Sequence, residues 1–293
     1  MAGDEALEGE TRGGFDMRQL AGERYPPPAW HLEKIEQELA EPDKTRMMRV
    51  VARMGAQDAP DLSAIDWDRE LERFHGIDFP SYYTQPFHSV PGGYLSEAAA
   101  MGDRAAMEAI YEDAHPRRSL GVRDAIAALV PADATTLVDL GGGTGDLGAA
   151  VARLRPDARV RSIDASPFMV IVGEVQNAGI PNLSLEQGFA EDTGLADASV
   201  DAVMITLVFH ECPNRIKQKI LAEVLRILRP GGQLILSDTP HDDLHDYRGF
   251  YEPYKEEWLH WDPVSSLREA GFVDVERRDA APPLWTVIAR RPH

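Results

Sequence analysis

The fold is decided by the stretch Leu137-Val138-Asp139-Leu140-Gly141-Gly142-Gly143-Thr144-Gly145-Asp146-Leu147-Gly148. An apolar run leads directly into a glycine-rich turn, and a helical pattern follows the turn. Glycine lets the backbone adopt positive φ and approach a ligand closely, while the start of the next helix offers free N–H groups. The stretch therefore predicts a strand, a ligand-binding loop and a helix, in that order.

Two interpretations of this loop are open from its glycines alone. Gly143, Gly145 and Gly148 satisfy the dinucleotide pattern G-x-G-x-x-G, whereas the same loop read from Asp139 is D-x-G-x-G-x-G. Asp139 lies inside the predicted strand, where its carboxylate is placed to meet a cationic group rather than a pyrophosphate. Asp164 ends the next predicted strand, and an acid there is the usual partner of ribose hydroxyls with either ligand.

The chain beyond Pro131 has the texture of an α/β domain. Short apolar runs alternate with helical stretches, which predicts βαβ units and a parallel sheet covered on both faces. The helix expected at 215–228 has the clearest apolar stripe, and Pro230-Gly231-Gly232 is expected to stop it. The predicted strands are 136–140, 159–163, 183–186, 202–208 and 233–237.

The front of the chain has a different texture, and we divide the chain into three parts. Residues 1–29 are rich in glycine and proline and predict a flexible leader. Residues 30–118 carry helical stripes and predict a helical lid or substrate-binding region in front of a core at 119–293. Helices are expected at 96–113 and 120–130.

Composition excludes several classes of protein. The 293 residues carry 49 acidic and 30 basic side chains, a net charge of −19, and no long Lys/Arg run, which argues against a nucleic acid as partner. One cysteine excludes a disulfide framework within the chain. No apolar window is long enough to span a membrane, and the acidic start is unlike a signal peptide. We therefore expect a cytoplasmic protein that acts on a small molecule, with no membrane partner.

Residues from about 119 to 293 resemble the class I S-adenosylmethionine-dependent methyltransferases of the small-molecule type. This resemblance implies a Rossmann-like, doubly wound α/β fold. Its seven-stranded sheet would be mostly parallel with an antiparallel last hairpin. The resemblance also implies S-adenosylmethionine as cofactor. The motifs that carry it lie in the family's order at 138–145, 163–169, 190–191, 199–203, 207–211, 223–238, 267–277 and 285–291.

The resemblance implies which residues would hold most of the cofactor. Gly141, Gly143 and Gly145 would let the backbone pass under its methionine part. Asp139 would face the ammonium group, directly or through water. Asp164 would accept hydrogen bonds from the ribose hydroxyls.

The adenine contacts implied by the resemblance are less well defined. Ala165 would lie beside the adenine, and Ala190 and Glu191 would contact its edge. The family often has an aspartate where this chain has Phe189, so the adenine amino group would fall to Glu191 or Asp192.

His210 and Glu211 follow the fourth predicted strand and are the candidate catalytic residues. Acceptors are expected beyond the carboxyl ends of the strands, and an imidazole that titrates near 6.5 suits a hydroxyl proton. The alternative is that His210 only anchors a loop. His241 and His245 could share a helix face at a metal-binding spacing, but a solvated acidic loop is favoured. We expect no metal site and keep His241 as a substrate-binding candidate.

An aromatic segment interrupted by prolines, residues 78–94, is expected to be irregular, and its part from Tyr82 to Tyr94 is the candidate lid. Tyr83, His88 and Tyr94 are the candidate substrate-binding residues, and Gly92-Gly93 offers a hinge. The alternative is ordinary packing between the two parts of the chain.

These features favour a methyltransferase for a small molecule, with O-methylation of an aromatic or polyketide-like metabolite marginally preferred. C-, N- or S-methylation stays open, and so does the oligomeric state, a homodimer included. The alternatives of other classes are an NAD-dependent dehydrogenase, supported only by the literal G-x-G-x-x-G match, and a cofactor-binding scaffold without turnover.

Overall fold

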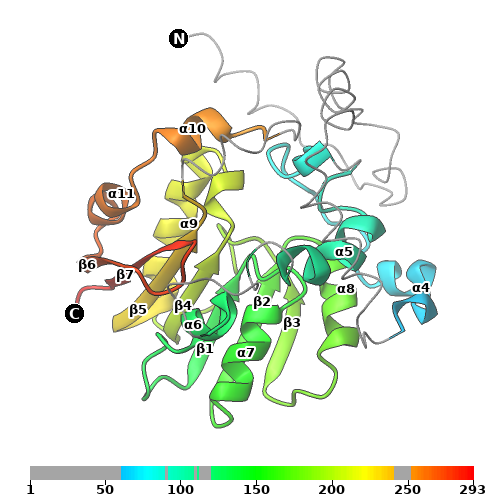
Figure 1. The fold of residues 1–293 in the computed structure, drawn as a ribbon, viewed down its shortest axis with the longest axis horizontal. Coiled ribbons are helices and arrows are strands. Elements are labelled where there is room, and N and C mark those ends of the chain that lie inside the picture. Colours follow the sequence, from blue (N-terminus) through cyan, green and yellow to red (C-terminus); the bar gives the residue numbers. More distant parts are fainter. Residues whose placement is uncertain (1–60, 90–91, 109–110, 112–119, 241–251) are drawn as a thin grey trace.

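A seven-stranded sheet with the order β3-β2-β1-β4-β5-β7-β6 forms the centre of the protein (Figure 1). Strands β1 to β5 pair in parallel, whereas β7 is antiparallel to both β5 and β6. The expected doubly wound sheet with an antiparallel last hairpin is thereby confirmed. The strands are β1 (Thr136–Leu140), β2 (Arg159–Asp164), β3 (Leu183–Gln187), β4 (Val200–Thr206), β5 (Leu228–Asp238), β6 (Val273–Arg278) and β7 (Trp285–Arg290).

This computed structural model describes residues 61–293 apart from 90–91, 109–110, 112–119 and 241–251. The predicted leader, the first predicted helices of the front region and His241 lie outside the described residues. No helix within the described ranges has the length and apolar character needed to cross a membrane.

Strand β5 differs most from expectation. The helix before it ends at Ile227, and the strand begins at Leu228 and runs through Pro230-Gly231-Gly232. Gly231 takes a φ of +76°, and the pairing with β4 shifts register between Val200 and Ala202. The glycines therefore bend the start of a longer strand instead of separating a helix from a short one.

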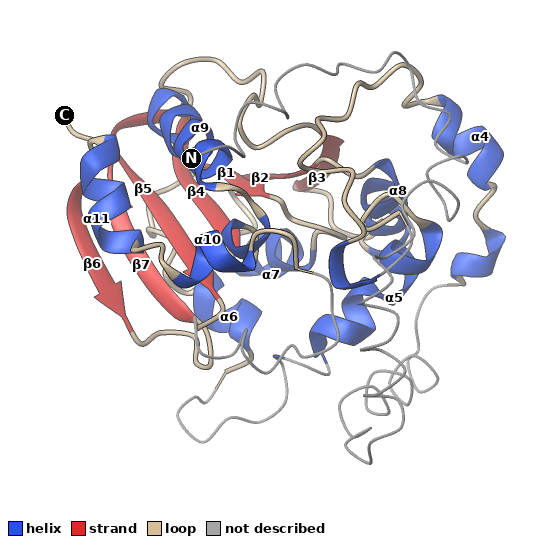
Figure 2. Ribbon diagram, turned by 90° about the horizontal axis from the view of Figure 1, so that it is seen from above, coloured by secondary structure: helices blue, strands red, loops and turns tan. Residues whose placement is uncertain are grey.

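Helices cover both faces of the sheet (Figure 2). Because side chains alternate along a strand, Val138 of β1 packs with α9 on one face and Leu137 packs with α6 and α7 on the other. The helices are α4 (Trp67–Glu72), α5 (Glu97–Met107), α6 (Val122–Ala127), α7 (Asp146–Leu154), α8 (Pro167–Gln176), α9 (Asn214–Ile227), α10 (Lys255–Leu259) and α11 (Pro263–Ala270).

The described part of the front region docks on α8. Leu95 and Ala100 pack in one apolar cluster with Phe168, and the Arg73 guanidinium binds both carboxylate oxygens of Glu174 at 2.7 and 2.8 Å. The described residues of the aromatic segment contain only the short 3-10 helix η3 (Phe87–Ser89), in agreement with the irregular character expected for them. This docking brings the front region over the carboxyl edge of the sheet.

Candidate active site

The glycine loop after β1 depends on three glycines in the left-handed region. Gly141, Gly143 and Gly145 have φ of +67°, +56° and +78°. A Cβ on Gly141 would lie 2.4 Å from Val208 Cγ2, and one on Gly145 would lie 2.4 Å from Leu185 Cδ1. Side chains are therefore excluded by conformation at all three positions and by space at two of them.

Asp139 lies beneath this loop rather than facing out of it. Its side chain is 1% exposed, and Oδ2 accepts hydrogen bonds from the Gly148 N–H at 3.1 Å and the Ser162 hydroxyl at 3.2 Å. Burial raises the pKa of Asp139 to about 7, although both hydrogen bonds oppose that shift. The carboxylate thus ties the loop to α7 and β2.

Asp164, at the end of β2, contacts the same glycine loop. It accepts hydrogen bonds from the Gly143 and Ser166 N–H groups, each at 2.8 Å. Burial raises its pKa to about 6, with a smaller contribution from the charge of Asp103. Tyr83 lies close enough for the Asp164 charge to add to the burial that raises the tyrosine pKa.

The residues expected beside the adenine lie just after the ends of β2 and β3. The Ala165 carbonyl accepts a hydrogen bond from the Gln187 side chain at 3.2 Å, and Ala190 packs against the core. Glu191 Oε1 accepts a hydrogen bond from the Tyr82 hydroxyl at 2.5 Å. Glu191 Oε2 is buried and has no hydrogen-bond partner within the part of the chain that the structure describes.

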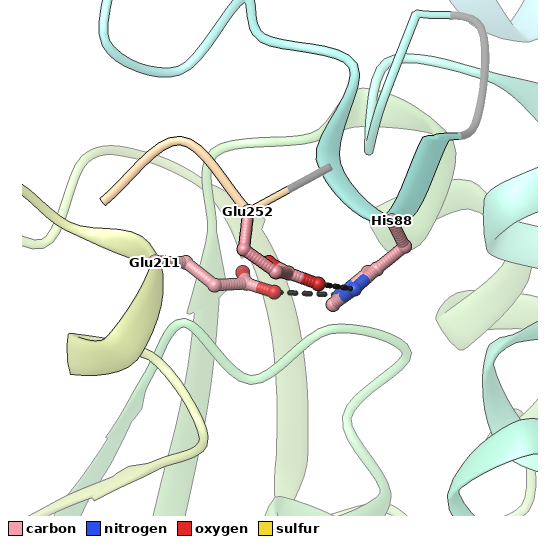
Figure 3. A group of neighbouring side chains, drawn as sticks. All are labelled: His88, Glu211 and Glu252. Carbon is pink, nitrogen blue, oxygen red and sulfur yellow. Dashed lines mark hydrogen bonds and ion pairs between the residues drawn. The ribbon is translucent and has the colours of Figure 1, made fainter. Parts of the chain in front are cut away.

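A second group of polar side chains lies past the end of β4 (Figure 3). His88 bridges two carboxylates, with Nδ1 2.6 Å from Glu252 Oε1 and Nε2 2.7 Å from Glu211 Oε1. The Tyr94 hydroxyl donates to Glu211 at 2.5 Å and lies 2.8 Å from His88 Nε2. The predicted residues His88, Tyr94 and Glu211 are thus brought together from two distant parts of the sequence.

His210 extends this group on its inner side. Nδ1 lies 2.7 Å from Oδ1 of Asp238, which is fully buried, and Nε2 lies 3.4 Å from Glu211 Oε1. Asp238 Oδ2 also accepts hydrogen bonds from the Phe209 and His210 N–H groups. Asp238 therefore fixes both the ring and the backbone of the short helix η5 (Phe209–Glu211).

The neighbouring carboxylates raise the pKa values of both imidazoles, His88 and His210. Burial lowers the pKa of His88, but Glu252 and Glu211 outweigh it and raise the pKa to about 10. Burial also opposes the shift at His210, whose pKa nevertheless lies well above its usual range because of Asp238. Burial would raise the pKa of Glu211, yet hydrogen bonds from His210 and His88 lower it to about 2. The pKa of His210 therefore lies above the value near 6.5 expected of an ordinary imidazole, which favours the protonated ring.

The ligand atoms of His88, Glu211 and Glu252 all lie within 4.8 Å of one another. Both ring nitrogens of His88 already bond to carboxylates, so a cation at this place would have to replace the ring proton on one side. As the side chains stand, the group is a hydrogen-bonded ion triad.

Asp103, Asp238 and Glu252 were not expected from the sequence. A signal existed for Asp238, which ends β5 beside the end of β4, since acids at the ends of neighbouring parallel strands meet at one edge. Asp103 and Glu252 reach the site only through the docking of other segments, and no local pattern marks them.

Comparisons with known proteins agree with this architecture. The sequence profile of a family described as methyltransferase domain matches residues 137–232. The chain is 34% identical over 136 residues to the ubiquinone/menaquinone biosynthesis C-methyltransferase UbiE of Rubrivivax gelatinosus, which covers 45% of this chain and 52% of that protein. It is 36% identical over 120 residues to an uncharacterized methyltransferase of Mycobacterium tuberculosis, which covers 41% of this chain and 46% of that protein. The chain thus spans about half the length of the curated relatives it matches.

Solved structures share the fold over a longer stretch. Human N-acetylserotonin methyltransferase, solved in complex with SAM, aligns with a TM-score of 0.55 at 16% identity over 89% of this chain and 70% of that one. The pyocyanin biosynthetic protein PhzM aligns with a TM-score of 0.50 at 18% identity over 66% of this chain and 58% of that one. At these identities the likeness concerns the fold.

Proposed function

Because the chain belongs to the class I S-adenosylmethionine-dependent methyltransferases, we propose that it methylates a hydroxyl oxygen of a small aromatic or polyketide-like molecule. The observation that carries this proposal is the alternating row of carboxylates and imidazoles past β4. The row runs Asp238, His210, Glu211, His88, Glu252.

The residues of the glycine loop fit S-adenosylmethionine. The loop glycines at positive φ carry no side chains. Asp164 offers its carboxylate to hydroxyl groups, and Glu191 has one oxygen without a partner among the described residues. Burial raises the pKa of Asp164 to about 6, which means that a positive charge arriving nearby would favour its ionised form. The bound cofactor would supply an activated methyl group on a sulfonium, so the protein needs mainly to align the acceptor and exclude water.

These five groups, called the acid–base row below, provide a place for the proton that an acceptor hydroxyl releases in O-methylation. Methylation of a hydroxyl releases one proton, and a positioned group must take it. In this row the Glu211 carboxylate lies between the His88 and His210 rings, at 2.7 and 3.4 Å, so a proton released by the acceptor can be shared among coupled groups. His210 then donates a hydrogen bond to the developing oxyanion, and Glu211 lies beside it to share the proton.

C-methylation is the second candidate, favoured by the relative named a C-methyltransferase of ubiquinone and menaquinone biosynthesis. Carbon beside a phenolic hydroxyl becomes nucleophilic when that hydroxyl loses its proton. The same row of groups would therefore serve either reaction, and the site of methylation depends on which atom is aligned with the methyl group.

The test combines binding and turnover. Calorimetry with S-adenosylhomocysteine and with NAD should show binding of the first alone, and radiolabelled S-adenosylmethionine should label hydroxylated aromatic acceptors in a panel. His210→Ala should reduce turnover at least about tenfold without weakening S-adenosylhomocysteine binding. Binding of NAD alone would overturn the proposal, and O-labelled against C-labelled product in NMR spectra separates the two candidates.

The pH dependence of cofactor binding gives a further prediction. Ribose hydroxyls bind the ionised form of Asp164, whose pKa is about 6, so affinity is retained above that pH and falls as the pH drops through it. From pH 7.5 to 5, the dissociation constant for S-adenosylhomocysteine should rise up to about tenfold because the ionised fraction falls by that factor. Asp164→Asn should bind more weakly at pH 7.5 and show a flatter profile in the same calorimetric series. A steep profile in the variant would assign the titration to another group.

A further inference from the structure

Asp103, from the front region, places a carboxylate against the glycine loop. It lies on α5, and Oδ2 accepts a hydrogen bond from the Thr144 hydroxyl at 3.0 Å. The same oxygen lies 3.2 Å from the position that a Cβ on Gly143 would occupy. An acidic side chain therefore lies directly against the glycine loop at Gly143 and Thr144.

The position of Asp103 is held by several contacts of its own helix. The next residue, Arg104, donates through Nε to Asp146 at 2.8 Å at the start of α7. Ser96 caps α5 by accepting from the Ala99 N–H at 3.2 Å, and the Ser166 hydroxyl donates to the Tyr94 carbonyl at 2.6 Å just before the helix. The carboxylate is thus built into the site instead of reaching it from a free surface.

Asp139, the acid expected to meet the ammonium group of the cofactor, binds groups of the protein below the glycine loop. Its Oδ2 accepts from Gly148 and Ser162 below the loop, and a Cβ on Gly142 would lie 2.7 Å from that oxygen. With 1% of its side chain exposed, Asp139 is screened from the ligand side by the loop backbone. A cation above the loop would therefore not contact Asp139, whereas Asp103 lies against Gly143 and Thr144.

The charges around Asp103 leave it suited to that role. Arg104 and Arg123 form ion pairs with Asp146. Burial, and then the charge of Asp146, raises the pKa of Asp103 above its usual range, although the charge of Arg123 and the hydrogen bonds from Thr144 oppose that shift. A cationic group beside Asp103 would relieve both effects.

We propose that Asp103 binds the ammonium group at the amino-acid end of S-adenosylmethionine, while Asp164 binds the ribose. This assignment rests on the proposed use of that cofactor. It makes the front region part of the cofactor site as well as a cover for the acceptor, so the core from 119 onward lacks one cofactor contact.

The experiment is a double-mutant cycle in calorimetry on the full chain. The ligands are S-adenosylhomocysteine and its analogue that lacks the amino group, and the proteins are wild type and Asp103→Asn. Asp103→Asn should raise the dissociation constant for S-adenosylhomocysteine about tenfold or more, as expected for a hydrogen bond between charged groups. The same substitution should change that of the deaminated analogue less than about twofold, because the two alterations remove one interaction.

Two control variants separate this role from a structural one. Thr144→Val removes the loop partner of Asp103 but keeps the carboxylate, and any loss should be equal for both ligands. Asp124→Asn alters an exposed acid of α6 and should change neither affinity. Equal losses for both ligands in Asp103→Asn, or no loss, would overturn the assignment. Failure of wild type to bind S-adenosylhomocysteine would instead refute the proposed function.

Discussion

Replacing Glu211 with glutamine is expected to lower acceptor turnover at least about a hundredfold and to leave the affinity for S-adenosylhomocysteine within about twofold. The Glu211 carboxylate lies within 2.7 Å of His88 Nε2 and accepts from the Tyr94 hydroxyl at 2.5 Å, with His210 Nε2 at 3.4 Å. Its neutral amide cannot balance two imidazolium groups or share the proton released by the acceptor. Loss of positioned acid–base chemistry costs this much in other enzymes.

Initial rates with saturating cofactor, together with calorimetry, check this prediction. Glu256→Gln on α10 is the matched control, since that residue is not part of the row and should keep wild-type turnover. Circular dichroism would show whether the variant folds. A Glu211→Gln enzyme that folds, binds cofactor and retains more than about a tenth of the turnover would show that the row does not handle the acceptor proton.

The core of the fold was predictable because its signals are local. The apolar run into the glycine loop lies within consecutive residues, and β1 appears at the expected bounds, Thr136–Leu140. Val208 and Leu185 leave no room for side chains at Gly141 and Gly145, which the sequence could not show. The glycines themselves nevertheless indicated a turn with positive φ. The extension of β5 through Pro230-Gly231-Gly232 was missed because pairing with β4 and β7 overrides the turn preference of those residues.

The acid–base row was only half predictable because it is assembled across the chain. His210 and Glu211 follow a strand and could be placed at its carboxyl edge from sequence. His88 and Glu252 are separated by 164 positions and meet only after the front region docks. No local pattern signals the raised pKa of His210 either: burial opposes that shift, but Asp238 and Glu211 flank the ring from different elements and outweigh it.

Trp258 connects this row to the stability of the domain, and its replacement by alanine is expected to have the largest effect on folding. Its ring is fully buried and stacks on Trp261 at 5.5 Å and on Trp285 at 5.8 Å between ring centres. The ring also lies edge-on to the His210 imidazole at 6.0 Å. Removal of a large buried ring leaves a cavity that its neighbours fill only in part.

Trp258→Ala should reduce the free energy of unfolding by about 3–5 kcal/mol, measured by urea denaturation of the full chain. Trp258→Phe keeps one ring in place and should lose less, while Leu154→Ala, at a side chain 54% exposed, should change it by less than about 0.5 kcal/mol. Since α10 packs on η5, turnover should also fall in Trp258→Ala under conditions where the variant is folded. A loss below about 1 kcal/mol at unchanged denaturant dependence would mean that the three tryptophans do not hold α10 against the sheet, and His210 would then need another support.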